Sequence, residues 1–342
     1  MLFRSETIRQ RLRTHGAAPA HEQRVLRLWA HALPQDSGRR KLEDFFPQAL
    51  RADLPALTEA LRGLATLRSS HPAADGSARL LVELADGQTV ESVLLPGDGL
   101  CVSTQVGCAV GCVFCMTGRD GLLRQLGSAE IVAQVALART QRTVRKVVFM
   151  GMGEPAHNLD NVMDAIEFLG TAGGIGHKQL VFSTVGDARV FERLPQGRVK
   201  PALALSLHST DAALRARLLP RAPRIAPAEL VALGEGYARA TNHPVQYQWT
   251  LIDGVNDSDD ELDGIVHLLA GKHACLNLIP YNTVDGLDFK RPLPERATAM
   301  ARTLLKHGVL TKLRQSAGQA VDAGCGQLRA RTGARVIELR PA

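Results

Sequence analysis

The chain has 342 residues, of which 45% are hydrophobic and 22% charged, and a formal net charge of +7. This length holds one large domain or two ordinary ones, and the composition is that of a soluble globular protein. No apolar run reaches the roughly 20 residues that a membrane-spanning helix needs, and the N-terminus MLFRSETIRQRLR lacks the apolar centre of a signal peptide. We therefore expect a cytoplasmic protein without a membrane segment. Clustered cysteines in such a protein bind metal or take part in chemistry more often than they form structural disulfides.

The positive charge is concentrated at the two ends of the chain. Residues 1–75 and 302–342 carry an excess of Lys and Arg, whereas residues 76–301 are slightly acidic. This distribution suits a polyanion that is held by the flanks while chemistry takes place between them, but it is equally typical of a surface that only keeps the protein soluble. Aromatic residues make up only 4% of the chain, so base-stacking surfaces are not indicated.

The first part of the chain is expected to be a small helical region, residues 1–75. Apolar residues follow helical spacing in HEQRVLRLWAHAL and in LPALTEALRGLATL. The segment SSHPAADGSA, residues 69–78, has the composition of a linker. Two apolar runs around Asp86-Gly87 then predict a β-hairpin extension.

From about residue 100 the pattern alternates between short β-rich runs and helical segments. The expected strands are LCVSTQV, KVVFM, QLVFST, ALALSLH, VQYQWTLI, CLNLIPY and VLTKLR. Helical segments lie between most of them, and SAEIVAQVALART has Ser128 as its expected N-cap. A βα repeat implies parallel strands covered by helices, so we predict an α/β fold with a partial (β/α)6 barrel.

Unusual residues recur where these strands end, which is the rim at which barrels of this kind carry their chemistry. Taken one by one these residues are ordinary, but their shared position favours a single site. They are Cys108 after the first strand, GMGEP (residues 151–155) after the second, Ser183 in the third, Ser206 and His208 in the fourth, and Asn282 after CLNLIPY.

Cys108 is the first residue of a metal-binding pattern, because Cys108, Cys112 and Cys115 are spaced C-x3-C-x2-C. Three thiolates can each hold one iron of a [4Fe-4S] cluster and leave the fourth iron open. An open iron accepts a bidentate ligand such as the amino and carboxylate groups of S-adenosylmethionine. Structural zinc usually takes four protein ligands, and here only one CxxC pair is present with no histidine in the loop, so zinc is the less favoured alternative.

This cysteine pattern after the first strand of a βα repeat resembles the radical S-adenosylmethionine superfamily. The motifs CVSTQVGC, FMGMGEP, FST, LSLH, NLIPYN and DAGCGQL, in this order between about residues 80 and 330, resemble the RlmN/Cfr family of RNA adenine methyltransferases. We accordingly divide the chain into an RNA-contacting accessory region (1–75), a radical S-adenosylmethionine catalytic core (76–330) and a basic C-terminal tail (331–342).

The resemblance implies both the cofactors and the residues that hold them. The cofactors are a [4Fe-4S] cluster on the three cysteines and S-adenosylmethionine, with two molecules used per turnover. Gly153 and Glu154 would contact the amino group of S-adenosylmethionine. The remaining cofactor contacts would be Ser183, Ser206, Leu207, His208 and Asn282.

The resemblance also implies roles for two cysteines outside the cluster. C2 of adenine is electrophilic and cannot attack a sulfonium methyl group, so Cys325 would first accept the methyl from one S-adenosylmethionine. A radical derived from a second molecule would then remove a hydrogen atom from this methyl, and the resulting carbon radical would add to the base. Glu91 would accept the ring proton, and Cys101 would release the RNA by forming a disulfide with Cys325. Cys275, in an apolar strand, is expected to be a core residue.

The predicted function is methylation of C2 of an adenine in 23S ribosomal RNA, and also in tRNA. The enzyme is expected to be a monomer that receives electrons from a donor such as flavodoxin. Methylation at C8 by the same chemistry stays open, and a non-catalytic, zinc-containing RNA-binding protein is the alternative from a different class. The ten residues before Cys325 lack the arginine found in many relatives, and residues 1–75 are divergent, which leaves open the RNA and the adenine.

Overall fold

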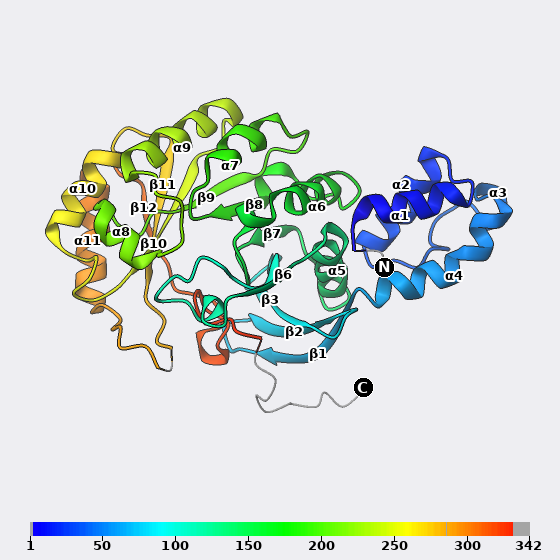
Figure 1. Ribbon diagram of the computed structural model, residues 1–342, viewed down its shortest axis with the longest axis horizontal. Helices are drawn as coiled ribbons and strands as arrows, with labels where there is room; N and C mark the ends of the chain where they lie inside the picture. Colours follow the sequence, from blue (N-terminus) through cyan, green and yellow to red (C-terminus); the bar gives the residue numbers. More distant parts are fainter. Residues whose placement is uncertain (1–2, 285, 331–342) are drawn as a thin grey trace.

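The computed structural model describes residues 3–284 and 286–330 and is built around one large sheet (Figure 1). The strands follow the order β1-β2-β3-β4-β7-β8-β9-β10-β11-β12, and every pairing from β4 to β12 is parallel. The parallel strands are β4 (Gly99–Cys101), β7 (Lys146–Phe149), β8 (Leu180–Thr184), β9 (Ala202–Ser206), β10 (Val245–Leu251), β11 (Ala274–Pro280) and β12 (Thr311–Leu313).

Helices connect the parallel strands and cover the outer face of the curved sheet (Figure 1). They give six β/α units followed by β12, which confirms the predicted partial (β/α)6 barrel. Burial explains the strand sequences, because LVFST in β8 is buried at all five positions, as expected for a parallel strand covered on both faces. The helices are α5 (Ser128–Arg139), α6 (Leu159–Thr171), α7 (Ala188–Arg193), α8 (Ala212–Leu218), α9 (Pro227–Thr241), α10 (Asp259–Leu269) and α11 (Pro294–Lys306).

Three antiparallel strands extend the sheet beyond β4. They are β1 (Ala65–Pro72), β2 (Ala78–Leu84) and β3 (Thr89–Leu95), and the predicted hairpin at Asp86-Gly87 joins β2 to β3. The expectation of a linker at residues 69–78 was wrong, since these residues end β1, turn and begin β2. A tight turn and a linker use the same Pro, Gly and Asp residues, so composition alone does not separate them.

The expected first strand, LCVSTQV, is broken in the structure. After β4 the chain crosses the end of β7, where the Val102 N–H donates to the Val148 carbonyl at 2.9 Å and the Thr104 N–H to the Met152 carbonyl at 2.9 Å. It then forms β5 (Gln105–Gly107), which pairs with β6 (Leu122–Gln125) in a separate two-stranded sheet. This crossing carries the cysteine-rich segment over the carboxyl end of the barrel. Ser128 proves to be the first residue of α5 rather than its N-cap.

The N-terminal helices form a lobe beside α5 and α6 (Figure 1). They are α1 (Ser5–Thr14), α2 (Pro19–Ala30), α3 (Leu42–Phe45) and α4 (Gln48–Arg62). The lobe is fastened by the Ser5 N–H, which donates to Ser128 Oγ at 2.9 Å, and by an edge-to-face contact of Trp29 with Phe168 at 5.5 Å. The tail expected at residues 331–342 lies outside the described residues. Among the described helices, none combines the length and apolar character needed to cross a bilayer.

Candidate active site

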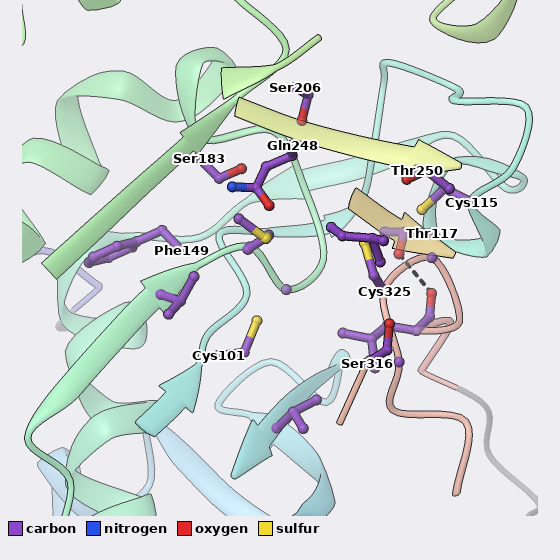
Figure 2. A pocket seen from close by; sticks show the side chains of 18 of the residues that line it. Cys101, Cys115, Thr117, Phe149, Ser183, Ser206, Gln248, Thr250, Ser316 and Cys325 are labelled. Carbon is purple, nitrogen blue, oxygen red and sulfur yellow. Dashed lines mark hydrogen bonds between the residues drawn. The ribbon is translucent and has the colours of Figure 1, made fainter. Parts of the chain in front are cut away.

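A cavity of about 460 Å³ opens at the carboxyl ends of the parallel strands and continues into the barrel (Figure 2). Five of the six cysteines line it, although they come from three separate parts of the sequence. These are Cys101 at the end of β4, Cys108, Cys112 and Cys115 on the loop after β5, and Cys325 near the end of the described chain. Cys275, which was expected in the core, is buried in β11 and does not line the cavity.

The cysteine loop, residues 107–118, is closed by main-chain contacts. The Cys108 N–H donates to the Gly121 carbonyl at 2.9 Å, and the Cys115 N–H donates to the Cys112 carbonyl at 3.0 Å. Gly107 has a positive φ of 77°, and a Cβ atom there would lie 2.0 Å from the Gly121 oxygen. The loop therefore needs glycine at this position in order to turn its thiols toward the cavity.

The three thiols of this loop line one cavity, where Cys108 is buried and Cys112 and Cys115 are half-buried. Burial raises the pKa of Cys108 to about 12, and the pKa of Cys112 is raised by burial and then by the neighbouring Cys115 and Cys108. Within the described residues no three His, Cys, Asp or Glu side chains converge on a single-ion site. A [4Fe-4S] cluster takes one thiolate per iron and needs no such convergence, whereas structural zinc does. The donor set therefore fits the iron–sulfur cluster better than it fits zinc.

The structure places a buried cation beside these thiols. The sequence did not reveal this residue. Arg215 in α8 is buried, and its Nη2 donates to the Ser206 carbonyl at 3.1 Å and to the Val185 carbonyl. Burial lowers its pKa to about 10, while the negative charges of Cys112 and Glu154 act in the opposite direction. Arg215 thus supplies positive charge beside a group of ligands that must be deprotonated to bind iron.

The GMGEP turn after β7 places Gly153 and Glu154 on the cavity wall. Gly153 has a φ of 105°, and a Cβ atom there would lie 2.6 Å from Cβ of Gln105. The Glu154 carboxylate accepts hydrogen bonds from the N–H groups of Ala156 at 3.1 Å and Val185 at 3.0 Å. Burial nevertheless raises its pKa to about 7. A buried carboxylate in this position is suited to an amino group that brings a compensating positive charge.

Ser183 and Ser206 also line the cavity (Figure 2), and so does His208, as the rim argument predicts. His208 has a φ of 60°, and its Nδ1 accepts a hydrogen bond from the Thr250 N–H at 2.9 Å. The neutral ring therefore carries its proton on Nε2. Burial, followed by the charge of Arg215, lowers the pKa of His208 to about 3.

Two predicted cofactor contacts lie outside the cavity wall. Leu207 is fully buried in the main core, and its N–H donates to the Gln248 carbonyl at 3.0 Å. Asn282 lies beneath the segment that carries Cys325, where its Nδ2 donates to the Cys325 carbonyl and to Ser316 Oγ, both at 2.9 Å. The observed contacts of Asn282 therefore hold a thiol-bearing loop in place.

Cys101 and Cys325 face the same cavity from opposite ends of the catalytic sequence (Figure 2). The pKa of Cys101 is raised to about 12 by burial, with a further contribution from Cys325. Cys325 is exposed to solvent at the cavity, and the surrounding protein and then Cys115 raise the pKa of its thiol. Cys325 is thus within electrostatic range of both Cys101 and the cysteine loop. All six cysteines are free thiols, so the disulfide expected between Cys101 and Cys325 is not formed in this structure.

The Cys325 loop, residues 314–328, is joined directly to the cysteine loop. The Met116 N–H donates to the Gly326 carbonyl at 2.8 Å, and Thr117 Oγ1 donates to the Leu328 carbonyl at 2.7 Å. These two contacts bring the end of the described chain against the loop of three cysteines.

Glu91, the predicted proton acceptor, is buried in β3 and does not line the cavity. Its Oε1 forms an ion pair with Arg79, and its Oε2 accepts the Arg329 N–H at 2.7 Å. Arg79 in turn donates to the Val321 carbonyl at 2.7 Å. In this conformation the carboxylate holds the chain after Cys325 directly, at Arg329, and the chain before Cys325 through Arg79, at Val321.

Three polar residues of β10, Gln246, Gln248 and Thr250, line the cavity and were not singled out from the sequence. The Thr250 hydroxyl is buried and has no hydrogen-bond partner within the described part of the chain. Gln246, Gln248 and Thr250 alternate along VQYQWTLI and therefore share one face of the strand. That alternation, in a strand expected to be buried on both faces, is the signal that could have identified them.

The fold and the thiol-lined cavity define a radical S-adenosylmethionine protein, and the radical SAM superfamily matches residues 102–267. The chain is 76% identical over 341 residues to a probable RNA methyltransferase of Methylibium petroleiphilum, which covers 99% of this chain and 97% of that protein. A probable RNA methyltransferase of Leptothrix cholodnii is 72% identical over 342 residues, with 99% of each chain covered. The crystal structure of a radical SAM methyltransferase from Sphaerobacter thermophilus matches with a TM-score of 0.82 and 34% identity, over 96% of this chain and 98% of that one.

The chain therefore belongs to the RlmN/Cfr-like family of radical S-adenosylmethionine RNA methyltransferases. Membership implies a [4Fe-4S] cluster and S-adenosylmethionine as cofactors. The non-catalytic, zinc-containing alternative is set aside, because this is a family of enzymes and the donor set favours iron.

Proposed function

We propose that the protein methylates C2 of an adenine in RNA by way of a methyl group carried on Cys325. One observation supports this proposal above all others. The Cys325 thiol, far from the cysteine loop in sequence, lines the same cavity as Cys108, Cys112, Cys115 and Cys101. A thiol that only filled the core would have no reason to face a site of radical chemistry.

Cys325 is the proposed methyl carrier, and Cys101 the proposed resolving thiol. When bound, the cluster and S-adenosylmethionine supply the methyl group and the hydrogen-abstracting radical, with two molecules of S-adenosylmethionine used per turnover. The Cys325 thiolate displaces the methyl group from sulfur, and loss of one hydrogen atom leaves a carbon radical that bonds to the ring carbon. Glu91 would take the ring proton and one electron would return to the bound cluster, after which the Cys101 thiolate attacks Cys325 Sγ. The carbon–sulfur bond breaks, the methylene carbon takes up a proton, and a transient Cys101–Cys325 disulfide awaits reduction.

Glu91 is the proposed acceptor of the ring proton. Its carboxylate is engaged by Arg79 and by the Arg329 N–H, so this role requires the Arg329 hydrogen bond to open when RNA is bound. Opening it would free one carboxylate oxygen while the ion pair with Arg79 still compensates the buried charge.

The cofactor is proposed to lie against the strand ends of β7 to β9. Gly153 and Glu154 would receive its amino group, and Ser183, Ser206 and His208 would offer polar contacts. These five residues share the cavity wall, which supports the assignment. Leu207 and Asn282 complete the proposed set, although neither lines the cavity. Leu207 would act by holding the end of its strand in place, and Asn282 by holding the Cys325 loop.

RNA is proposed as the substrate because relatives that match almost the whole chain are named probable RNA methyltransferases. The proposed targets are 23S ribosomal RNA and, in addition, tRNA. We further propose that the enzyme acts as a monomer in the cytoplasm and takes electrons from a flavodoxin-like donor.

Mass spectrometry of nucleosides tests the proposal. A strain that lacks the gene should lose 2-methyladenosine from ribosomal RNA or tRNA, and the wild-type gene should restore it. Cys325→Ala should fail to restore it, whereas Cys275→Ala, which removes a thiol outside the cavity, should succeed. Loss of 8-methyladenosine instead would assign the reaction to C8, and an unchanged nucleoside profile would show that the proposed reaction is wrong.

A further inference from the structure

The cavity that contains Cys325 extends away from the thiols along the interior of the partial barrel. Its wall includes Lys146 at the start of β7 and Arg314 immediately after β12. Because a strand rises about 3.3 Å per residue, Lys146 is roughly 13 Å along β7 from Met150 at the thiol end. The cavity thus has a cationic end that the proposed methyl transfer does not use.

Two cations, Lys146 and Arg314, line this end of the cavity, and exposed Lys312 lies on β12, two residues before Arg314. In keeping with this placement, burial lowers the pKa of Lys146, and the charges of Arg314 and Lys312 lower it further. Over residues 3–284 and 286–330, no carboxylate forms an ion pair with any of them. Like charges held together in a partly buried place favour an anionic partner.

The guanidinium of Arg314 is oriented by a fixed contact. Its Nε donates to Oδ1 of Asn277 at 2.8 Å, and Asn277 is itself buried in β11. This hydrogen bond leaves the two terminal nitrogens available at the cavity. A planar guanidinium fork of this kind matches the oxygens of a phosphate.

A second cavity, of about 950 Å³, adjoins the first and shares Leu95, Pro96 and Lys146 with it. Its wall adds three arginines and a single carboxylate, Asp98, which pairs with Arg145 at 3.6 Å. Arg139 and Arg142 are fixed there by hydrogen bonds to backbone carbonyls. Lys146 is therefore the junction between the thiol-lined cavity and a positively charged one.

Protection of a sheet edge is the simpler explanation for charges on β12, which ends the sheet. It accounts for Lys312 and Arg314, which are exposed on or next to that strand. It does not account for Lys146, because β7 is paired with β4 on one side and β8 on the other. Half-buried Lys146 lines the cavity together with Arg314, and an anionic ligand that enters the cavity, such as a single RNA strand, would compensate both charges.

We propose that Lys146 and Arg314, which both line the cavity, form a phosphate-binding site for the RNA strand next to the target nucleotide, with exposed Lys312 adding positive charge beside them. The strand then leaves along the second cavity, past Arg145. The inference rests on the proposed function, since a base presented to Cys325 must stay joined to a backbone that leaves the cavity. The ligand chemistry is the phosphodiester, so these residues position the strand and do not read its sequence.

The test compares three single substitutions in the reconstituted, full-length enzyme: Lys146→Gln, Arg314→Gln and the control Arg302→Gln. Arg302 is exposed on α11 and lines neither cavity, so it removes the same charge elsewhere. Binding of a fluorescein-labelled oligoadenylate RNA is measured over a series of KCl concentrations. Loss of one phosphate contact should reduce the slope of log K against log salt by about 0.7. Binding should weaken about equally for RNAs of other sequence.

The result expected is a reduced slope for Lys146→Gln and Arg314→Gln with an unchanged slope for Arg302→Gln. Lys312→Gln, at an exposed position, provides the same comparison if Lys146→Gln does not fold. Wild-type slope and affinity in these variants would overturn the phosphate site, even if adenine is still methylated. Slower reduction by flavodoxin with unchanged RNA binding would also overturn it and assign the site to an acidic protein. A reduced slope in a protein that methylates no adenine would instead refute the proposed function and leave the phosphate site standing.

Discussion

The cysteine loop and the Cys325 loop meet at one cavity but are held in different ways. The cysteine loop is closed by main-chain hydrogen bonds, such as those from the N–H groups of Cys108 and Cys115, and by a glycine that admits no side chain. The Cys325 loop receives one main-chain hydrogen bond from the cysteine loop, at the Gly326 carbonyl. Its other anchors include side chains from elsewhere, such as those of Asn282, Arg79 and Asp75, whose carboxylate accepts the Gly318 N–H at 2.9 Å. Main-chain closure suits a fixed ligand frame, whereas side-chain contacts can be exchanged one at a time. A methyl carrier must meet a cofactor, a base and a second thiol in turn, so it needs contacts that can be exchanged.

The largest effect is expected in the fixed loop. Cys112→Ala removes one of three thiolates, so the reconstituted protein should lose its iron–sulfur cluster and all methylation. Iron and sulfide analysis after anaerobic reconstitution measures this. Cys275→Ala is the matched control, because it removes a buried thiol outside the cavity and should keep wild-type iron content. Full iron content in Cys112→Ala would show that the loop does not bind the cluster as described.

The next effect distinguishes the two thiols outside the cysteine loop. Cys101→Ala should keep its iron and still form the bond between Cys325 and the base, but it lacks the thiol that breaks this bond. We expect protein covalently attached to RNA to accumulate, visible as a slower band on a denaturing gel and removed by ribonuclease. Adding Cys325→Ala should abolish the adduct. Free methylated RNA from Cys101→Ala would rule out the resolving role.

A smaller effect is expected where the Cys325 loop is anchored. Asn282→Ala removes the donor to the Cys325 carbonyl, which should weaken docking of the loop by about 1–3 kcal/mol. Hydrogen exchange at residues 316–328 should become faster while the iron content stays unchanged. Asn158→Ala is the control, since Asn158 also donates from a buried amide to two carbonyls, those of Thr104 and Leu126. If exchange is unchanged in Asn282→Ala, the amide is not a principal anchor.

The smallest effect is expected in the N-terminal lobe, outside both loops. It is a change in stability that serves as a reference for the effects predicted in the two loops. Asp53 forms a two-point contact with Arg11 in the N-terminal lobe, and the hydrogen bond from Arg11 lowers the pKa of Asp53. The pair therefore stabilises the folded state above the unfolded-state pKa of about 3.9, and this contribution is lost as the pH falls through the lower folded-state value. Because the pair is partly exposed, Asp53→Asn should cost at most about 1 kcal/mol at pH 7. Urea midpoints at neutral and acidic pH measure this cost, which should disappear in acid; a cost that persists there would point to another cause.

The sequence predicted best what depends on local spacing. The strand and helix pattern gave the β/α units, and C-x3-C-x2-C located a loop that the structure places at the cavity. It predicted poorly what depends on pairing between distant segments. The turn at residues 73–77 looked like a linker because nothing local shows that β1 pairs with β2. The expected strand LCVSTQV breaks because its N–H groups bond to the end of β7.

The candidate site shows the same division. Ser183, Ser206 and Gly153 could be placed on the cavity wall because they follow parallel strands, whose ends meet at one rim. Arg215 and Arg79 could not, because an arginine in an amphipathic segment is ordinarily exposed and only the folded chain shows that both are buried. The contacts of Asn282 and Glu91 with the Cys325 loop could not be predicted either. They form only because the folded chain returns to the cavity at the end of the catalytic core.

The hydrogen bond from the Thr250 N–H to His208 Nδ1 has a consequence for kinetics. Nδ1 of His208 already accepts this hydrogen bond, and the pKa of the ring is lowered to about 3. His208 therefore takes up no proton at any pH at which the enzyme works. The dependence of kcat/KM for S-adenosylmethionine on pH reports groups of the free enzyme, and it should contain no imidazole ionisation from this residue. A rise near pH 7 would belong to Glu154, which becomes charged there and can then attract an ammonium group. In many enzymes the rise on the acid side of a bell-shaped pH profile is attributed to a histidine. In this protein that rise would report the Glu154 carboxylate.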